Sequence, residues 1–76
     1  MKFTMFLHGV NLEQKNLEEL LYKATKDEAI ISFSGGVVRL DFTIDANHIS
    51  DAINSAEKAL YKSDVKFGNI GYSLQR

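Results

Sequence analysis

The stretch that decides the fold is AIISFSGGVVRLDFTI, residues 29–44, in which two apolar-alternating runs are joined by Gly35-Gly36. A two-residue Gly-Gly link predicts a β-hairpin, because glycine reaches the positive φ angles of type I′ and II′ turns without a steric penalty. The turn also sets the pairing of the strands, with Ser34 opposite Val37. A slip of one residue would move the whole apolar set into water, so the pattern and the turn support each other.

The predicted hairpin has an apolar surface and a polar surface. The pairs on the apolar surface are Phe33 with Val38, Ile31 with Leu40, and Ala29 with Phe42. The opposite surface receives Ser32 against Arg39 and Ile30 against Asp41. Ser32, Arg39 and Asp41 therefore form a candidate polar patch on the open face of a sheet. A substrate carboxylate can dock on Arg39, while cross-strand polar pairing on a solvated face is the ordinary explanation.

The chain before the hairpin predicts a strand and a helix. Residues 2–8 alternate between apolar and polar and predict the strand. The polar run 11–16 leads into a helix with the apolar stripe Leu17, Leu20, Leu21 and Ala24. Either Asn16 with Glu19 or Asn11 with Gln14 fits a capping box at the start of this helix.

The chain after the hairpin predicts a second helix and a last strand. The helix has the continuous apolar stripe Ile49, Ala52, Ile53, Ala56, Ala59 and Leu60. Asn47 or His48 is expected as its N-cap, and Asp51 lies in the first turn, where the helix dipole favours negative charge. Residues 65–74 have strand character, and Gly68 and Gly71 in this segment indicate a bulge or a twisted edge.

The order strand, helix, strand, strand, helix, strand predicts an α+β fold of the ferredoxin-like βαββαβ type, a split βαβ sandwich. Right-handed crossovers then give a four-stranded antiparallel sheet in the order 4-1-3-2, with both helices on one face. The 76 residues contain no linker or repeat, so we expect one domain over residues 1–76. A chain this short buries only about 60% of its unfolded surface, which favours self-association.

Composition excludes several classes of function. The chain has no cysteine, hence no thiolate metal site or thiol nucleophile, and its net charge of −1 does not point to nucleic acid, although it does not exclude it. His8 and His48, the only two imidazoles, fall at a strand end and a helix cap without a ligand set or a nucleophile. We therefore expect no enzyme activity, no metal and no cofactor. With no membrane span or signal peptide in the sequence, we expect a cytoplasmic protein.

The run from Asp27 to Leu60 resembles a known family. The motifs that carry the resemblance are Asp27-Glu28-Ala29, Gly36-Val37, Leu40-Asp41-Phe42 and Ala52-Ile53-Asn54-Ser55-Ala56. They are similar to a largely uncharacterised small bacterial α/β domain that often precedes an excisionase-like helix-turn-helix. That helix pair is absent from these 76 residues. The resemblance thus implies an accessory part of a regulatory or mobile-element system, and the helix of residues 49–60 also resembles the helix of HicB-type antitoxins.

Three functions follow as hypotheses. The first is a non-enzymatic interaction module that binds a protein partner, or itself as a homodimer, through an edge of the sheet, because neither edge strand contains proline or a run of charge. The candidate interface on the last strand consists of Phe67, Ile70, Tyr72 and Leu74. The second is a nucleic-acid-associated regulator, transcriptional or antitoxin-like. The third is a small-ligand sensor that uses the sheet face or a dimer interface.

Overall fold

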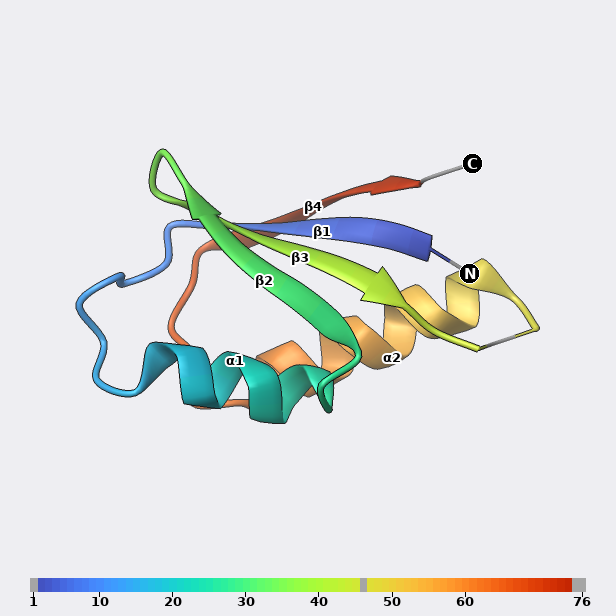
Figure 1. The fold of residues 1–76 in the computed structure, drawn as a ribbon, viewed down its shortest axis with the longest axis horizontal. Helices are drawn as coiled ribbons and strands as arrows, with labels where there is room; N and C mark the ends of the chain where they lie inside the picture. The colour runs from blue at the N-terminus through green and yellow to red at the C-terminus, as the bar shows by residue number, and fades with distance from the viewer. Residues whose placement is uncertain (1, 46, 75–76) are drawn as a thin grey trace.

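The computed structural model describes residues 2–45 and 47–74, which form a four-stranded sheet with two helices on one of its faces (Figure 1). The elements are β1 (Lys2–His8), α1 (Leu17–Thr25), β2 (Ala29–Ser34), β3 (Val37–Thr43), α2 (Ile49–Lys62) and β4 (Asn69–Leu74). All neighbouring strands pair antiparallel, in the order β2-β3-β1-β4. The predicted α+β class and four-stranded antiparallel sheet are therefore confirmed.

The β2–β3 hairpin has the predicted turn and register. Gly35 and Gly36 have φ angles of 56° and 80°, the two positive values that define a type I′ turn. Every predicted pair occurs, from Ser34 opposite Val37 to Ala29 opposite Phe42. Glycine is favoured here by the positive φ angles and not by lack of space, because apart from the neighbouring residues no heavy atom lies within 4 Å of the position that a Cβ would take at Gly35 or Gly36.

The core lies between the sheet and the helices and follows the predicted apolar stripes. The buried side chains of the sheet are Phe3, Met5, Leu7, Ala29, Val38, Leu40 and Phe42, and those of the helices include Leu17, Leu21, Ala52, Ile53, Ala56 and Leu60. The rings of Phe3 and Phe42, which pair across β1 and β3, stack with centroids 4.8 Å apart. The central strands therefore bury one face completely.

Both helices begin at positions that the sequence predicted, but neither N-cap side chain makes a capping hydrogen bond. Asn16 occupies the N-cap position of α1, but its backbone is left-handed (φ 60°) and its side chain makes no capping hydrogen bond. The predicted capping box of Asn16 with Glu19 is therefore wrong. Asn11 instead closes a separate turn, because its Oδ1 accepts a hydrogen bond from the Glu13 N–H. At α2 the N-cap is His48, whose side chain likewise makes no capping hydrogen bond.

The last strand is shorter than predicted, because β4 begins at Asn69 and not at residue 65. The pairing with β1 ends where β1 ends, at His8 opposite Asn69, and just before β4 the Gly68 N–H donates to the His8 carbonyl over 2.8 Å. A Cβ on Gly9 would lie 3.2 Å from the Gly68 nitrogen, so glycine is needed where these segments meet. Within β4 the pairing with β1 runs one-to-one from Asn69 to Leu74, so of the two predicted alternatives, a bulge or a twisted edge, there is no bulge at Gly71.

The turn gives a first test. Gly36→Val should lower the free energy of unfolding by about 1 kcal/mol or more, because a β-branched residue is strained at positive φ. Gly35→Asn is the matched control and should change it by less than about 0.5 kcal/mol, because asparagine tolerates the left-handed region. Urea denaturation measures both values. Equal losses for the two variants would contradict the type I′ assignment.

Candidate functional site

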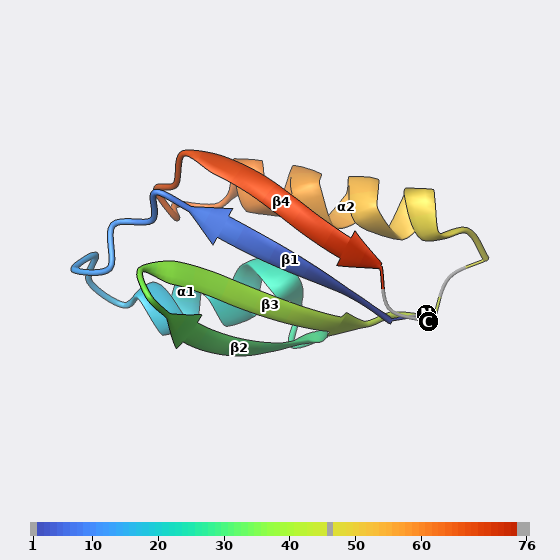
Figure 2. The ribbon, with the colours of Figure 1, turned by 90° about the horizontal axis from the view of Figure 1, so that it is seen from above.

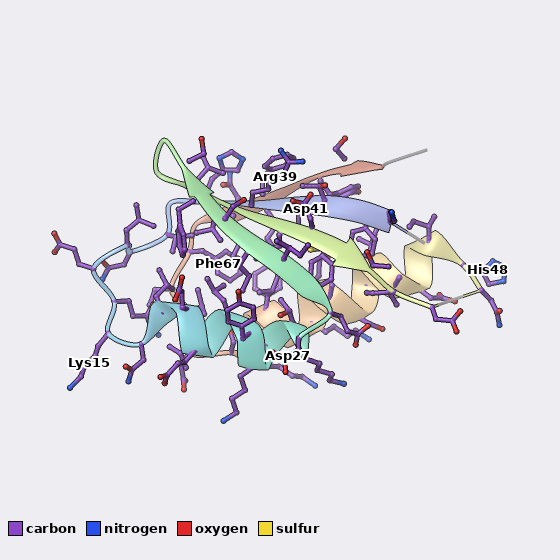
Figure 3. All side chains as sticks on the ribbon, viewed as in Figure 1. Lys15, Asp27, Arg39, Asp41, His48 and Phe67 are labelled. Carbon is purple, nitrogen blue, oxygen red and sulfur yellow. The ribbon has the colours of Figure 1, made fainter. Side chains whose placement is uncertain are left out.

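The face of the sheet opposite the helices carries polar side chains, and Arg39 and Asp41 lie on it (Figure 3). These two residues are two apart on β3 and therefore share a face. The pairing of β1 with β3 places Phe6 opposite Arg39 and Thr4 opposite Asp41. The pairing of β2 with β3 places Ser32 on the other side of Arg39. We refer to this surface as the open face.

A hydrogen-bonded chain of three side chains holds Arg39 in place. The Thr4 hydroxyl donates to Asp41 Oδ1 over 2.7 Å, although Thr4 is only 2% exposed. Arg39 Nε donates to both carboxylate oxygens of Asp41, at 3.2 Å and 3.0 Å. The Arg39 side chain is 49% exposed. A buried hydroxyl thus positions a carboxylate, which in turn positions a half-exposed guanidinium.

The predicted polar patch is only partly a bonded unit. Arg39 and Asp41 form an ion pair, while Ser32 lies beside Arg39 in the register but makes no hydrogen bond through its side chain to the described residues. Thr4 was missed by sequence reasoning. Thr4 lies on the polar side of the alternating run of residues 2–8, which was the only indication in the sequence. Its hydrogen-bond partner Asp41 becomes apparent only from the pairing of β1 with β3.

A hollow of about 300 Å³ lies on the open face toward the hairpin turn, lined by Phe6, His8, Ser34, Val37 and Arg39. Its base is apolar, because Phe6 and Val37 are half-buried there. The imidazole of His8 lies near Gly71, with Nε2 3.6 Å from the position that a Cβ on this glycine would take. The hollow therefore combines an apolar base with side chains that donate hydrogen bonds.

The two edges of the sheet are a second kind of candidate surface. Residues that flank a two-residue hairpin turn exchange hydrogen bonds, and bonded pairs then alternate along the ladder. The Thr43 N–H bond to the Glu28 carbonyl, 3.1 Å long, continues this alternation beyond β2. The backbone groups of Ala29, Ile31 and Phe33 consequently point away from the sheet along the β2 edge. The same alternation continues through β3 and β1 to β4. There, the backbone N–H and C=O groups of Ile70, Tyr72 and Leu74 point away from the sheet.

The β4 edge lies above one flank of α2. The opposite flank of this helix, with Ala59 and Lys62, lines a groove against α1. Tyr61 is on the flank that faces away from α1, and its ring lies 5.3 Å from that of Phe67 between centroids. Seen from above, α2 projects past β4 (Figure 2). A strand that joined β4 would therefore lie over α2 as well as beside β4.

The members of the predicted interface differ in how they are placed. Tyr72 is 56% exposed, whereas Ile70 is half-buried and packs on the core. Phe67 lies before β4 and is half-buried beside Tyr61. Leu74 belongs to β4, but its side chain lies outside the described part of the structure. Tyr72 is thus the one member whose described side chain is more than half exposed.

In the described residues 2–45 and 47–74, no three histidine, aspartate or glutamate side chains come together as a possible metal site. No helix in these residues is long and apolar enough to cross a membrane.

The sequence matches no protein-family model, and no curated protein is similar to it. The resemblance to a bacterial α/β domain therefore stays a prediction.

The Thr4–Asp41 hydrogen bond gives a second test. In a double-mutant cycle, Thr4→Val and Asp41→Ala should show a coupling energy of about 1–2 kcal/mol, because a charge-assisted bond to a buried hydroxyl is lost. The matched cycle of Arg39→Ala with Asp41→Ala should give less than about 0.5 kcal/mol, because this ion pair is exposed to solvent. Urea denaturation of the five variants and the unmodified protein gives both values. A larger coupling for Arg39 would contradict the order of the two contacts.

Proposed function

We propose that this chain is a small non-enzymatic interaction module that binds an extended strand at the β4 edge, with a second copy of itself as the first partner. The observation that supports it is an unpaired edge strand without charge between Asn69 and Leu74. Exposed edge strands of this kind add a further strand unless charge, proline or a bulge prevents it. The resulting homodimer would extend the antiparallel sheet.

A two-fold axis fits the spacing of the outward groups on β4. These groups belong to alternate residues, Ile70, Tyr72 and Leu74. An axis at Tyr72 would set this residue against its own copy and Ile70 against Leu74 of the second copy. All the outward N–H and C=O groups of the three residues would then pair, and closed two-fold dimers are the commonest homo-oligomers.

The side chains near β4 favour this edge over the β2 edge. The exposed rings of Tyr61 and Tyr72 lie on the helix side of the sheet, where an added strand would cover them. Large aromatic side chains contribute most of the apolar area at interfaces. At β2 the exposed apolar residues are Ile30 and Phe33, which lie on opposite faces of the strand, so an added strand would cover fewer of them together.

We propose that the fold is of the ferredoxin-like split βαβ type. The strand order, which read from β4 is β4-β1-β3-β2, supports this, as do the helices that connect β1 to β2 and β3 to β4. We also propose a cytoplasmic location, which the absence of cysteine supports.

The dimer is tested by removing one outward N–H group. Tyr72→Pro should give a monomer at a protein concentration of ~100 µM where the unmodified protein is a dimer, because proline takes away a donor that β1 does not use. Ile31→Pro is the matched control, since it removes the equivalent donor from the β2 edge and should leave the dimer intact. Tyr72→Lys, which places charge on the edge, should repeat the effect.

Sedimentation equilibrium measures the three variants, and circular dichroism verifies that they are folded. An unmodified protein that is monomeric at this concentration would contradict self-association. A dimer that is lost only with Ile31→Pro would show that β2 is the edge in use.

Nucleic-acid binding is the competing function, and a mobility-shift assay separates the two. With mixed-sequence DNA and RNA we expect no complex, because a net charge of −1 gives little phosphate neutralisation. The control is the same assay at low salt, where weak electrostatic binding is strongest. A tight complex that weakens steeply as salt is added would favour the nucleic-acid-associated regulator.

A further inference from the structure

The hollow on the open face is separate from the β4 edge and is not used by strand addition. Its lining residues come from β1, β2 and β3, and the strand register places them on the same face as Arg39, opposite the buried face of the sheet. Strand addition at β4 uses backbone groups in the plane of the sheet. Whatever binds in the hollow can therefore bind to a monomer or a dimer.

Arg39 supplies a positioned cation at the rim of this hollow. Its Nε is engaged by Asp41, but the four N–H groups on its two terminal nitrogens have no hydrogen-bond partner among the described residues. A guanidinium presents its donors as a planar fork that matches the oxygens of a carboxylate or a phosphate. Because Asp41 is itself held by buried Thr4, the side chain of Arg39 needs little ordering when an anion binds.

The other groups around the hollow suit an anion as well. Ser34 carries a hydroxyl donor, and the imidazole ring of His8 carries an N–H donor. No carboxylate is among the residues that line the hollow. Asp41, the nearest acidic residue on β3, is already bonded to Arg39 Nε and to Thr4. An anion in the hollow would thus meet donors from three strands.

The base of the hollow adds an apolar requirement. Phe6 lies directly opposite Arg39, and Val37 lies two residues before Arg39 on the same face of β3. In the ladder alternation, Phe6 and Arg39 form a non-hydrogen-bonded pair, in which the side chains approach most closely. A flat group placed over the Phe6 ring would consequently leave its charged end beside the guanidinium.

We propose that this hollow binds a small molecule in which a carboxylate or a phosphate is attached to a flat apolar group. Arg39 binds the anion, Phe6 and Val37 contact the apolar part, and His8 and Ser34 donate hydrogen bonds. Thr4 and Asp41 do not touch the ligand and act as positioning residues for Arg39. A volume of about 300 Å³ is at the lower end for ligand sites and accommodates about one aromatic ring with its anionic group.

The test is an NMR titration of the full ¹⁵N-labelled chain with phenyl phosphate and, separately, with benzoate. We expect saturable amide shifts at Phe6, His8, Val37 and Arg39. Arg39→Gln should weaken binding by about tenfold or more, because a charge-assisted pair is lost. The matched control is Lys58→Gln, which removes the same charge from an exposed position on α2 and should leave the affinity unchanged.

Two further measurements separate this site from general electrostatic attraction. Inorganic phosphate should bind about tenfold more weakly than phenyl phosphate, because it lacks the part that contacts Phe6. Thr4→Val should weaken phenyl phosphate binding while keeping the protein folded, as followed by the dispersion of the same spectra. Equal weakening by Lys58→Gln and Arg39→Gln, or the absence of saturable shifts with both probes, would overturn the proposal. If inorganic phosphate and phenyl phosphate bound with equal affinity, the proposed contact of an apolar group with Phe6 and Val37 would be overturned.

Discussion

The type I′ turn at Gly35-Gly36 is the constraint on which the rest of the sheet depends. Its two positive φ angles join β2 to β3 with Ser34 opposite Val37, and the alternation of bonded and non-bonded pairs follows from that first pair. The same alternation passes through β3 and β1 to β4. One turn therefore decides which backbone groups point outward at both edges and which side chains lie on the open face.

This coupling separates the two candidate surfaces. On β4 the outward backbone groups belong to residues whose side chains are on the helix side, such as Ile70 and Tyr72. The open-face residue between them is Gly71, which has no side chain, and the His8 imidazole lies beside it. The proposed edge contact would thus use the backbone and the helix-side residues, whereas the proposed ligand on the open face would use Arg39 and its neighbours.

The sequence was sufficient for features that depend on local pattern and insufficient for those that depend on distant contacts. The hairpin register and the apolar stripes of both helices were predictable, because alternation and helical spacing are properties of neighbouring residues. The start of β4 was not, because it depends on where β4 meets the end of β1, at His8 opposite Asn69, some sixty residues away in the chain. The predicted capping hydrogen bond of α1 is absent for a different reason. Asn16 adopts a left-handed backbone conformation, which asparagine tolerates, and its side chain makes no capping bond.

The candidate site shows the same division. The polar patch around Arg39 was visible in the hairpin, but its bonded partner Thr4 is contributed by β1 and appears only when the strands pair. At β4, the predicted interface included Phe67, yet this residue lies before the strand and is half-buried beside Tyr61. The groups exposed along the β4 edge are therefore mainly backbone N–H and C=O groups, together with the side chain of Tyr72. Since backbone hydrogen bonds carry affinity and side chains carry selectivity in strand addition, strand addition at this edge, as proposed, would accept many strand sequences, and the spacing of the outward groups together with Tyr72 would favour a two-fold copy.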